Sequence, residues 1–169
     1  SIPMNFLDNI EIVFHLAAIH GGRGFITKHP ADVSSNFSID HHVFEACMDA
    51  NVNNLIFAST SSVYGETNDF PISEKFNTDK PIQYYAATKK SNEVMAFSYS
   101  QLFNIKTIGL RFFTVYGPWG RPDMSLFKFT KNIILNKEIE VFNQGRHFRD
   151  FTYIDDIVKG ILGSIKYIN

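Results

Sequence analysis

The chain has 169 residues, of which 44% are hydrophobic and 20% charged, and its net charge is -1. A charge so close to zero gives no electrostatic basis for binding nucleic acid or an anionic membrane. No apolar run approaches the roughly 18 residues that cross a bilayer, and no Cys or His spacing suits a metal cage. These features predict a soluble, cytoplasmic protein without a metal site.

Three short, almost continuously apolar runs predict buried strands of a parallel sheet. They are IEIVFHLA (10–17), NLIFAST (54–60) and KTIGLRFF (106–113). Runs of this kind are typical of strands whose two faces are both covered by helices. Helical spacing of apolar residues predicts connecting helices over residues 30–50 and 82–103, with Pro30 in the first turn. This order predicts right-handed crossovers and an α/β fold with a doubly wound parallel sheet.

The sequence changes character after residue 113. The Gly- and Pro-rich stretch TVYGPWGRPD predicts a loop. Further elements are a helix in SLFKFTKNIILNK (125–137), a short strand in EIEVFN (138–143), a strand-like piece near FTY (151–153) and a closing helix in DIVKGILGSIKYI (156–168). We therefore expect residues 114–169 to form a small cap that follows the sheet, which is a usual place to shape a pocket.

The segment YYAATKK (84–90) opens the second long helix and places Tyr85 and Lys89 four residues apart. A helix brings positions i and i+4 onto one face. A phenol with a pKa of about 10 is a poor base at neutral pH, but a nearby positive charge favours its phenolate form. By spacing alone, the two residues are either an ordinary surface pair or a general base with its electrostatic partner.

Four motifs occur in the order that is typical of the extended short-chain dehydrogenase/reductase superfamily. They are HLAA (15–18), ASTSSVYG (58–65), YAATK (85–89) and RFFTVYGPWGRPD (111–123). The chain thereby resembles the NAD-dependent nucleotide-sugar epimerases. From about Asn54 onward it is most similar to the UDP-glucuronate 4-epimerases, including RDFTYIDDIV (149–158). The resemblance implies a Rossmann-type NAD-binding domain within residues 1–113 and part of a nucleotide-sugar-binding cap within residues 114–169.

The resemblance also implies a reaction and a catalytic triad. The reaction is the 4-epimerisation of a UDP-sugar, UDP-glucuronate to UDP-galacturonate, through a 4-keto intermediate with retained NAD. Tyr85 is implied as the general base, Lys89 as its electrostatic partner and a ligand of the nicotinamide ribose, and Thr60 as a hydrogen-bond partner of the reacting hydroxyl. The positions implied to face NAD are Ala17, Ala18, Asn36, Tyr85 and Lys89.

The substrate positions separate this chain from related activities. The sugar 4,6-dehydratases carry an acidic pair after the catalytic threonine, whereas Ser61 and Ser62 stand there in this chain, which disfavours elimination. Thr114 occupies a position where galactose epimerases typically have Asn, and it favours a uronate. The substrate residues that the resemblance implies are Ser61, Ser62 and Thr114 for the carboxylate, Arg121 and Arg149 for the pyrophosphate, and Phe142 for the uracil pocket.

Two departures from the family pattern leave alternatives open. No G-x-G-x-x-G or G-x-x-G-x-x-G occurs, although such a turn normally holds the pyrophosphate of a dinucleotide. The loop over residues 20–30 also differs from the usual one. We therefore expect a chain truncated at both ends. The alternatives are a UDP-glucuronate epimerase, an epimerase of another nucleotide-sugar, or a fragment that retains the triad but cannot hold NAD alone. A homodimer through the two long helices is implied.

Overall fold

The computed structural model describes residues 6–67, 69–146 and 148–168. Among these, the residues through Phe112 and those from Ile161 onward form a first compact unit, and Phe113–Gly160 form a second. One boundary of this division falls beside residue 113, where the sequence predicts a change of domain, whereas residues 161–168 group with the first unit. The assignment of the two parts to a cofactor domain and a substrate cap stays a prediction.

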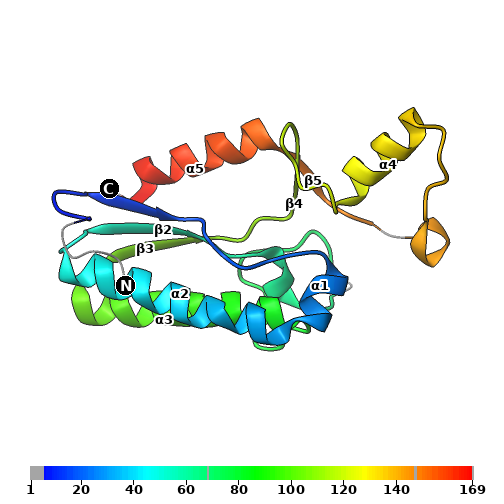
Figure 1. Cartoon of the computed structure of the whole chain (residues 1–169). Coiled ribbons are helices and arrows are strands. Elements are labelled where there is room, and N and C mark those ends of the chain that lie inside the picture. Colours follow the sequence, from blue (N-terminus) through cyan, green and yellow to red (C-terminus); the bar gives the residue numbers. More distant parts are fainter. Residues whose placement is uncertain (1–5, 68, 147, 169) are drawn as a thin grey trace. The chain divides into compact units, whose positions relative to one another are not determined.

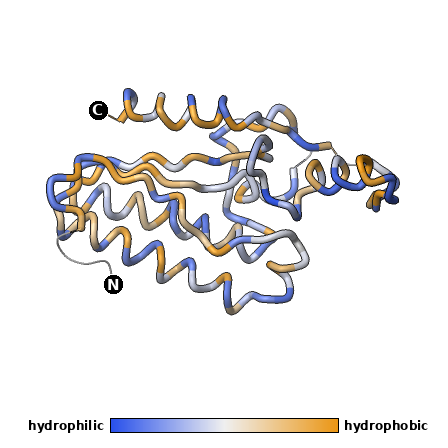
Figure 2. The backbone as a smooth tube through the Cα atoms, turned by 45° about the horizontal axis from the view of Figure 1, so that its top comes forward, coloured by the Kyte–Doolittle hydropathy of each residue, from blue (hydrophilic) through white to orange (hydrophobic). Residues whose placement is uncertain are grey.

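The first unit is built on a three-stranded parallel sheet (Figure 1). Its strands, in spatial order, are β1 (Ile12–His15), β2 (Asn54–Ala58) and β3 (Lys106–Leu110). In the register, Val13 pairs with Leu55, and Leu55 pairs with Thr107. Most side chains of the central strand are buried, and Figure 2 shows hydrophobic stretches along all three strands. The predicted parallel α/β arrangement is confirmed.

Two long helices connect these strands, α2 (Pro30–Asp49) and α3 (Tyr84–Phe103). They pack against each other on the same side of the sheet (Figure 1). Pro30 suits the start of α2 because the first turn of a helix needs no backbone donor. The hydrophobic core joins the helices to the sheet, and in it the ring of Phe44 lies edge-on to that of Phe57 with centroids 6.2 Å apart.

The segment that the sequence predicts as an unusual loop, residues 20–30, contains the short helix α1 (Arg23–Lys28). The carbonyl oxygen of Gly22 accepts hydrogen bonds from the N–H groups of Phe25 and Ile26, which begins the first turn. The local sequence HGGRGF hides this helix because glycines are poor helix formers.

The second unit contains a two-stranded parallel sheet, one helix and the start of another. The strands are β4 (Thr114–Tyr116) and β5 (Phe151–Tyr153), and the helices are α4 (Ser125–Ile134) and the start of α5 (Ile154–Ile168). The loop prediction for residues 114–116 is wrong. Thr114 pairs with Phe151, so hydrogen-bond partners for β4 come from a distant part of the chain that local composition does not reveal.

The predicted strand over residues 138–143 is also wrong. Residues 138–141 have no regular structure, and Phe142–Gly145 form a tight turn, η2, in which Asn143 and Gln144 have positive φ. The described residues offer this segment no partner strand, and a strand without a partner leaves its backbone groups unsatisfied. Across the described part of the chain, no helix is long and apolar enough to cross a membrane.

Candidate active site

The carboxyl ends of the three parallel strands meet at one edge of the first unit's sheet, where parallel sheets place their ligands. Ala17 and Ala18 follow the end of β1, and Thr60 follows the end of β2. Two backbone hydrogen bonds continue the pairing beyond the strands, from Ser59 N–H to the Leu110 oxygen and from Ser61 N–H to the Phe112 oxygen, each 2.9 Å long. These bonds hold the chain on both sides of Thr60 to the segment that follows β3.

Thr60 caps a 3₁₀ turn, η1 (Ser61–Tyr64). Its Oγ1 accepts a hydrogen bond of 3.2 Å from the N–H of Ser62. The hydroxyl proton of Thr60 is not used by this bond. Ser61 and Ser62 lie in the same turn and are half-buried, as Thr60 is. One short turn at the sheet edge therefore presents three hydroxyl groups.

Tyr85 and Lys89 lie in the first turns of α3, with Tyr85 half-buried. Lys89 is only 1% exposed, and within the described part of the chain its Nζ finds no hydrogen-bond partner. Burial lowers the pKa of Lys89, and the negative charge of Asp40 opposes that effect. Lys89 is therefore a buried amine and not a surface lysine.

Asn36, on the buried face of α2, joins α3 to the segment after β1. Its Oδ1 accepts from the backbone N–H of Ile19 at 2.7 Å, and its Nδ2 donates to the Ile19 carbonyl at 2.9 Å. The same Nδ2 donates to Thr88 Oγ1 at 3.4 Å, and Thr88 Oγ1 donates to the carbonyl of Tyr85 at 2.8 Å. These bonds bring the segment that contains Ala17 and Ala18 close to the start of α3.

Glu93, one turn after Lys89, receives hydrogen bonds from the ends of the other two strands. Arg111 donates through Nε at 2.8 Å and through Nη2 at 2.9 Å, and Ser59 Oγ donates at 2.6 Å. Burial by itself would raise the pKa of Glu93, but these hydrogen bonds and the charges of Arg111 and Lys90 lower it below its usual range. The network fixes α3 against the strand ends that flank Thr60.

A second buried polar pair was not expected from the sequence. His15, the last residue of β1, and Asp40, on α2, are joined by a contact of 2.6 Å between Nε2 and Oδ1, and both are almost fully buried. One signal for Asp40 was present. It stands at a helical position between Val33 and Phe44, where the buried stripe of α2 is otherwise mostly apolar.

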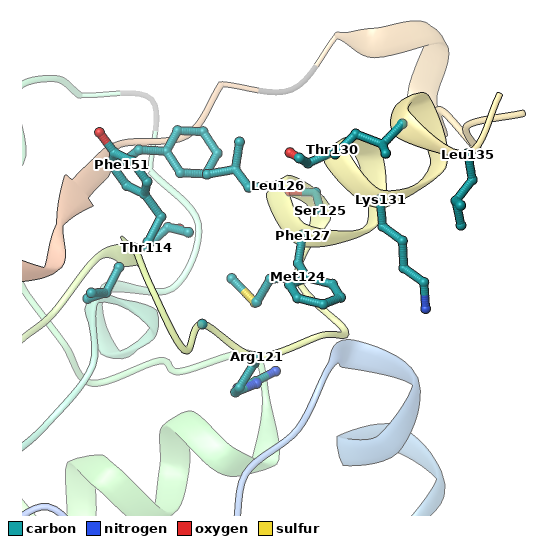
Figure 3. A pocket seen from close by; sticks show the side chains of 15 residues that line it. Thr114, Arg121, Met124, Ser125, Leu126, Phe127, Thr130, Lys131, Leu135 and Phe151 are labelled. Carbon is teal, nitrogen blue, oxygen red and sulfur yellow. The ribbon is translucent and has the colours of Figure 1, made fainter. Parts of the chain in front are cut away.

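The second unit has a hollow of about 650 Å³ beside β4, β5 and the start of α4 (Figure 3). Thr114 and Arg121 both line it, together with apolar side chains such as Met124, Phe127 and Phe151. Arg121 forms a two-pronged ion pair with Asp123, with distances of 2.8 and 2.6 Å. A mostly apolar hollow with a few placed polar groups is typical of a small-molecule site.

The other two predicted substrate residues of this unit lie elsewhere. Phe142 is 67% exposed and lines a neighbouring hollow, which also includes Lys128 and Lys131. Arg149 is exposed, and its Nη1 donates to the carbonyl of Phe148 at 2.7 Å. The structure thus brings Thr114 and Arg121 to one hollow and does not bring Phe142 or Arg149 there.

The first unit offers a fit for one part of a nicotinamide dinucleotide. The buried Nζ of Lys89 is a hydrogen-bond donor without a protein acceptor among the described residues, and the hydroxyls of a ribose are suitable acceptors. Ala17 and Ala18, which follow β1, have small side chains and are exposed and half-buried, respectively. Among the described residues, no group of three or more His, Cys, Asp or Glu side chains is placed to hold a metal ion.

The sequence model of the NAD dependent epimerase/dehydratase family matches residues 4–167. Protein CapI of Staphylococcus aureus is 52% identical over 156 residues, which are 92% of this chain and 47% of CapI. UDP-glucuronate 4-epimerase 3 of Arabidopsis thaliana is 48% identical over 157 residues, 90% of this chain and 36% of that protein. The crystal structure of UDP-glucuronic acid 4-epimerase from Bacillus cereus, in complex with UDP-glucuronic acid and NAD, matches with a TM-score of 0.90 and 36% identity, over 98% of this chain and 52% of that one. The chain thus spans about half, or less, of the length of these proteins.

Proposed function

This chain belongs to the NAD-dependent epimerase/dehydratase family, and on that basis we propose that it carries the catalytic centre of a UDP-sugar 4-epimerase that interconverts UDP-glucuronate and UDP-galacturonate. The family resemblance seen in the sequence is confirmed. One observation carries the proposal: Lys89, one helical turn after Tyr85, is buried with an Nζ that no described residue satisfies. A lysine that serves only as a solvated surface charge would have its ammonium group in water and not buried.

Tyr85 and Thr60 act on the hydroxyl of the reacting sugar carbon. Tyr85 Oη accepts the hydroxyl proton, and the Lys89 ammonium makes this possible because a nearby positive charge favours the phenolate. Thr60 Oγ1 already accepts from the Ser62 N–H, so its own proton remains available for the reacting oxygen. NAD, when bound, supplies the reversible oxidation of that carbon, and Lys89 would hold its nicotinamide ribose.

The serine pair supports epimerisation over elimination. Ser61 and Ser62 stand directly after Thr60, where loss of water would require an acid and a base. Hydroxyl groups suit a carboxylate instead, since each donates a hydrogen bond without adding charge. We assign them to the carboxylate of a uronate. This assignment rests on the similarity to UDP-glucuronate 4-epimerases, of which one is 48% identical over 157 residues.

The hollow of the second unit supports a nucleotide-sugar substrate. Arg121 contributes a guanidinium group to its lining, and a guanidinium suits phosphate oxygens. The two-pronged ion pair with Asp123 holds the guanidinium group of Arg121 in one orientation. Arg149 and Phe142, which the resemblance implies for the pyrophosphate and the uracil, remain proposals for the substrate-bound protein.

Outward-facing apolar side chains support a homodimer through the two long helices. Val94, Phe97 and Leu102 of α3 are all more than half exposed. A second copy of this pair of helices would cover them.

The proposed function is tested by supplying the purified chain with NAD and UDP-glucuronate and following UDP-galacturonate by chromatography. We expect product with the wild type and none with Tyr85→Phe, while the Tyr85→Phe variant still binds UDP-sugar. UDP-glucose and UDP-N-acetylglucosamine, offered in parallel, test the substrate class. Absence of bound NAD and of any product from a folded chain would favour the non-catalytic fragment, and conversion of a neutral sugar alone would favour an epimerase of another nucleotide-sugar.

A further inference from the structure

The buried contact between His15 and Asp40 has no role in the mechanism described above. The imidazole of His15 ends β1, the carboxylate of Asp40 lies on α2, and their side chains are 2% and 1% exposed. Asp40 Oδ1 accepts the bond from His15 Nε2. Its other oxygen, Oδ2, is buried and finds no hydrogen-bond partner among the described residues. A charge buried in a region of low dielectric acts over longer distances than it does in water.

The same buried layer contains Lys89. Asn36, one turn before Asp40, donates a hydrogen bond to Thr88, which directly precedes Lys89. The buried face of α2 therefore meets the buried face of α3 at this level. Asp40 Oδ2 on α2 and Lys89 Nζ on α3 are both buried, and neither finds a hydrogen-bond partner in the described part of the chain.

The other charged or titratable groups on the elements around Lys89 are engaged or exposed. Glu93, on the same helix, is bound by Arg111, which follows β3 and also donates to the hydroxyl of Tyr64 on η1. Lys28 on α1 and Lys106 on β3 are exposed to solvent. Tyr85, on α3 itself, is the group that Lys89 is proposed to serve. Asp40, by contrast, is buried beside this layer, and its negative charge raises the pKa of the buried Lys89 amine against the effect of burial.

We propose that Asp40, held in place by His15, is a positioning residue of the Tyr85–Lys89 pair, whose buried carboxylate keeps the Lys89 side chain in its ammonium form. The proposal rests on the proposed function, because it is through Lys89 that Asp40 would act on the reaction. Burial favours the neutral amine, and a neutral amine cannot favour the phenolate of Tyr85. A nearby negative charge opposes the loss of the ammonium proton. The burial of Lys89 lowers its pKa and the charge of Asp40 raises it, which agrees with this role.

The test measures the ionisation of Lys89 directly. The purified chain is labelled with ¹³C at the ε-carbon of lysine, and the Lys89 resonance, identified from a Lys89→Met sample, is followed across pH in the wild type and in Asp40→Asn. We expect the titration midpoint of Lys89 to move to lower pH in Asp40→Asn. Asp49→Asn removes the same charge from an exposed position of α2 and should leave the midpoint unchanged. A Lys89 midpoint that does not move, or moves to higher pH, in folded Asp40→Asn overturns the proposal.

A second variant and a second readout separate this inference from the proposed function. Asp40→Ser removes the charge with a smaller side chain, and it serves if Asp40→Asn does not fold. In the NAD-loaded protein, the alkaline limb of kcat should also move to lower pH in the Asp40 variant. If no epimerase activity is found but the Lys89 midpoint shifts as expected, the proposed function fails and the electrostatic role of Asp40 stands. If activity is present and the midpoint does not shift, the role of Asp40 alone is refuted.

Discussion

Replacing Lys89 with methionine should make the chain more stable while it removes the function we assign to the site. Lys89 is 1% exposed, and no hydrogen bond satisfies its Nζ within the described residues. Methionine keeps an unbranched side chain that adapts to the same space. The change therefore removes an unsatisfied buried charge without opening a large cavity.

The expected gain follows from the cost of burying such a group. An unsatisfied buried polar group costs about 1–3 kcal/mol, and a charged one more. The attraction of Asp40 offsets part of this cost, so we expect Lys89→Met to raise the free energy of unfolding by about 1–2 kcal/mol near pH 7. In the absence of NAD, urea unfolding followed by circular dichroism measures this difference.

The pH dependence of the gain has a fixed sign. Because the pKa of Lys89 is lower in the folded chain than its ordinary value of 10.5, the unfolded chain binds more protons between the two values. Stability of the wild type then rises with pH in that window, and the advantage of Lys89→Met should shrink there. Lys90→Met is the matched control. Because Lys90 Nζ donates a hydrogen bond to Thr78 Oγ1 at 2.6 Å, the Lys90→Met chain should be less stable than the wild type. A Lys89→Met chain less stable than the wild type would refute the reasoning.

Further substitutions probe two positions of the scaffold and the proposed dimer. Glu93→Gln should lower the free energy of unfolding by about 1.5–3 kcal/mol at pH 7, as expected for hydrogen bonds to a charged group. Because the pKa of Glu93 is lowered in the folded chain, the difference should persist above the unfolded pKa of about 4.3 and disappear as the pH falls through the folded value. Gly65→Ala should cost about 1–3 kcal/mol in denaturant unfolding, since Gly65 has a φ of +67° and a Cβ there would lie 2.7 Å from the carbonyl oxygen of Lys80. Gly24→Ala, where a Cβ would meet no atom within 4 Å, should not destabilise the chain. Phe97→Glu, on the exposed face of α3, should convert a dimer to a monomer in light scattering, and an unchanged mass would contradict the proposed dimer.

The sheet of the first unit could be predicted because its strands are continuous apolar runs, and because the segments between them have apolar residues at helical spacing. The second unit could not be predicted in the same way. The register between Thr114 and Phe151 depends on a pairing across 37 positions of sequence, and the segment that begins at Thr114 has the composition of a turn. Residues 138–143 alternate like a strand, but alternation gives a strand only where a neighbouring strand satisfies the backbone.

The candidate site could likewise be predicted from the sequence only where its residues are close together in the chain. The spacing of Tyr85 and Lys89 is local, so helical periodicity alone is enough to predict that both lie on one face. The contact of His15 with Asp40 joins residues 25 apart and depends on how α2 packs against the sheet. A carboxylate within an otherwise mostly apolar helical stripe was the available sign, and it indicates burial without indicating the partner.

The central claim is that this centre inverts a sugar carbon by reversible oxidation at that same carbon, with Tyr85 moving the hydroxyl proton. Its most direct test supplies the chain with NAD and UDP-glucuronate that carries deuterium at C4, in ordinary water, and analyses the product by mass spectrometry and NMR. The account predicts UDP-galacturonate that retains the deuterium at C4, and no product with Tyr85→Phe. Product that has exchanged the C4 deuterium for solvent hydrogen, or product formed equally well by Tyr85→Phe, would contradict it.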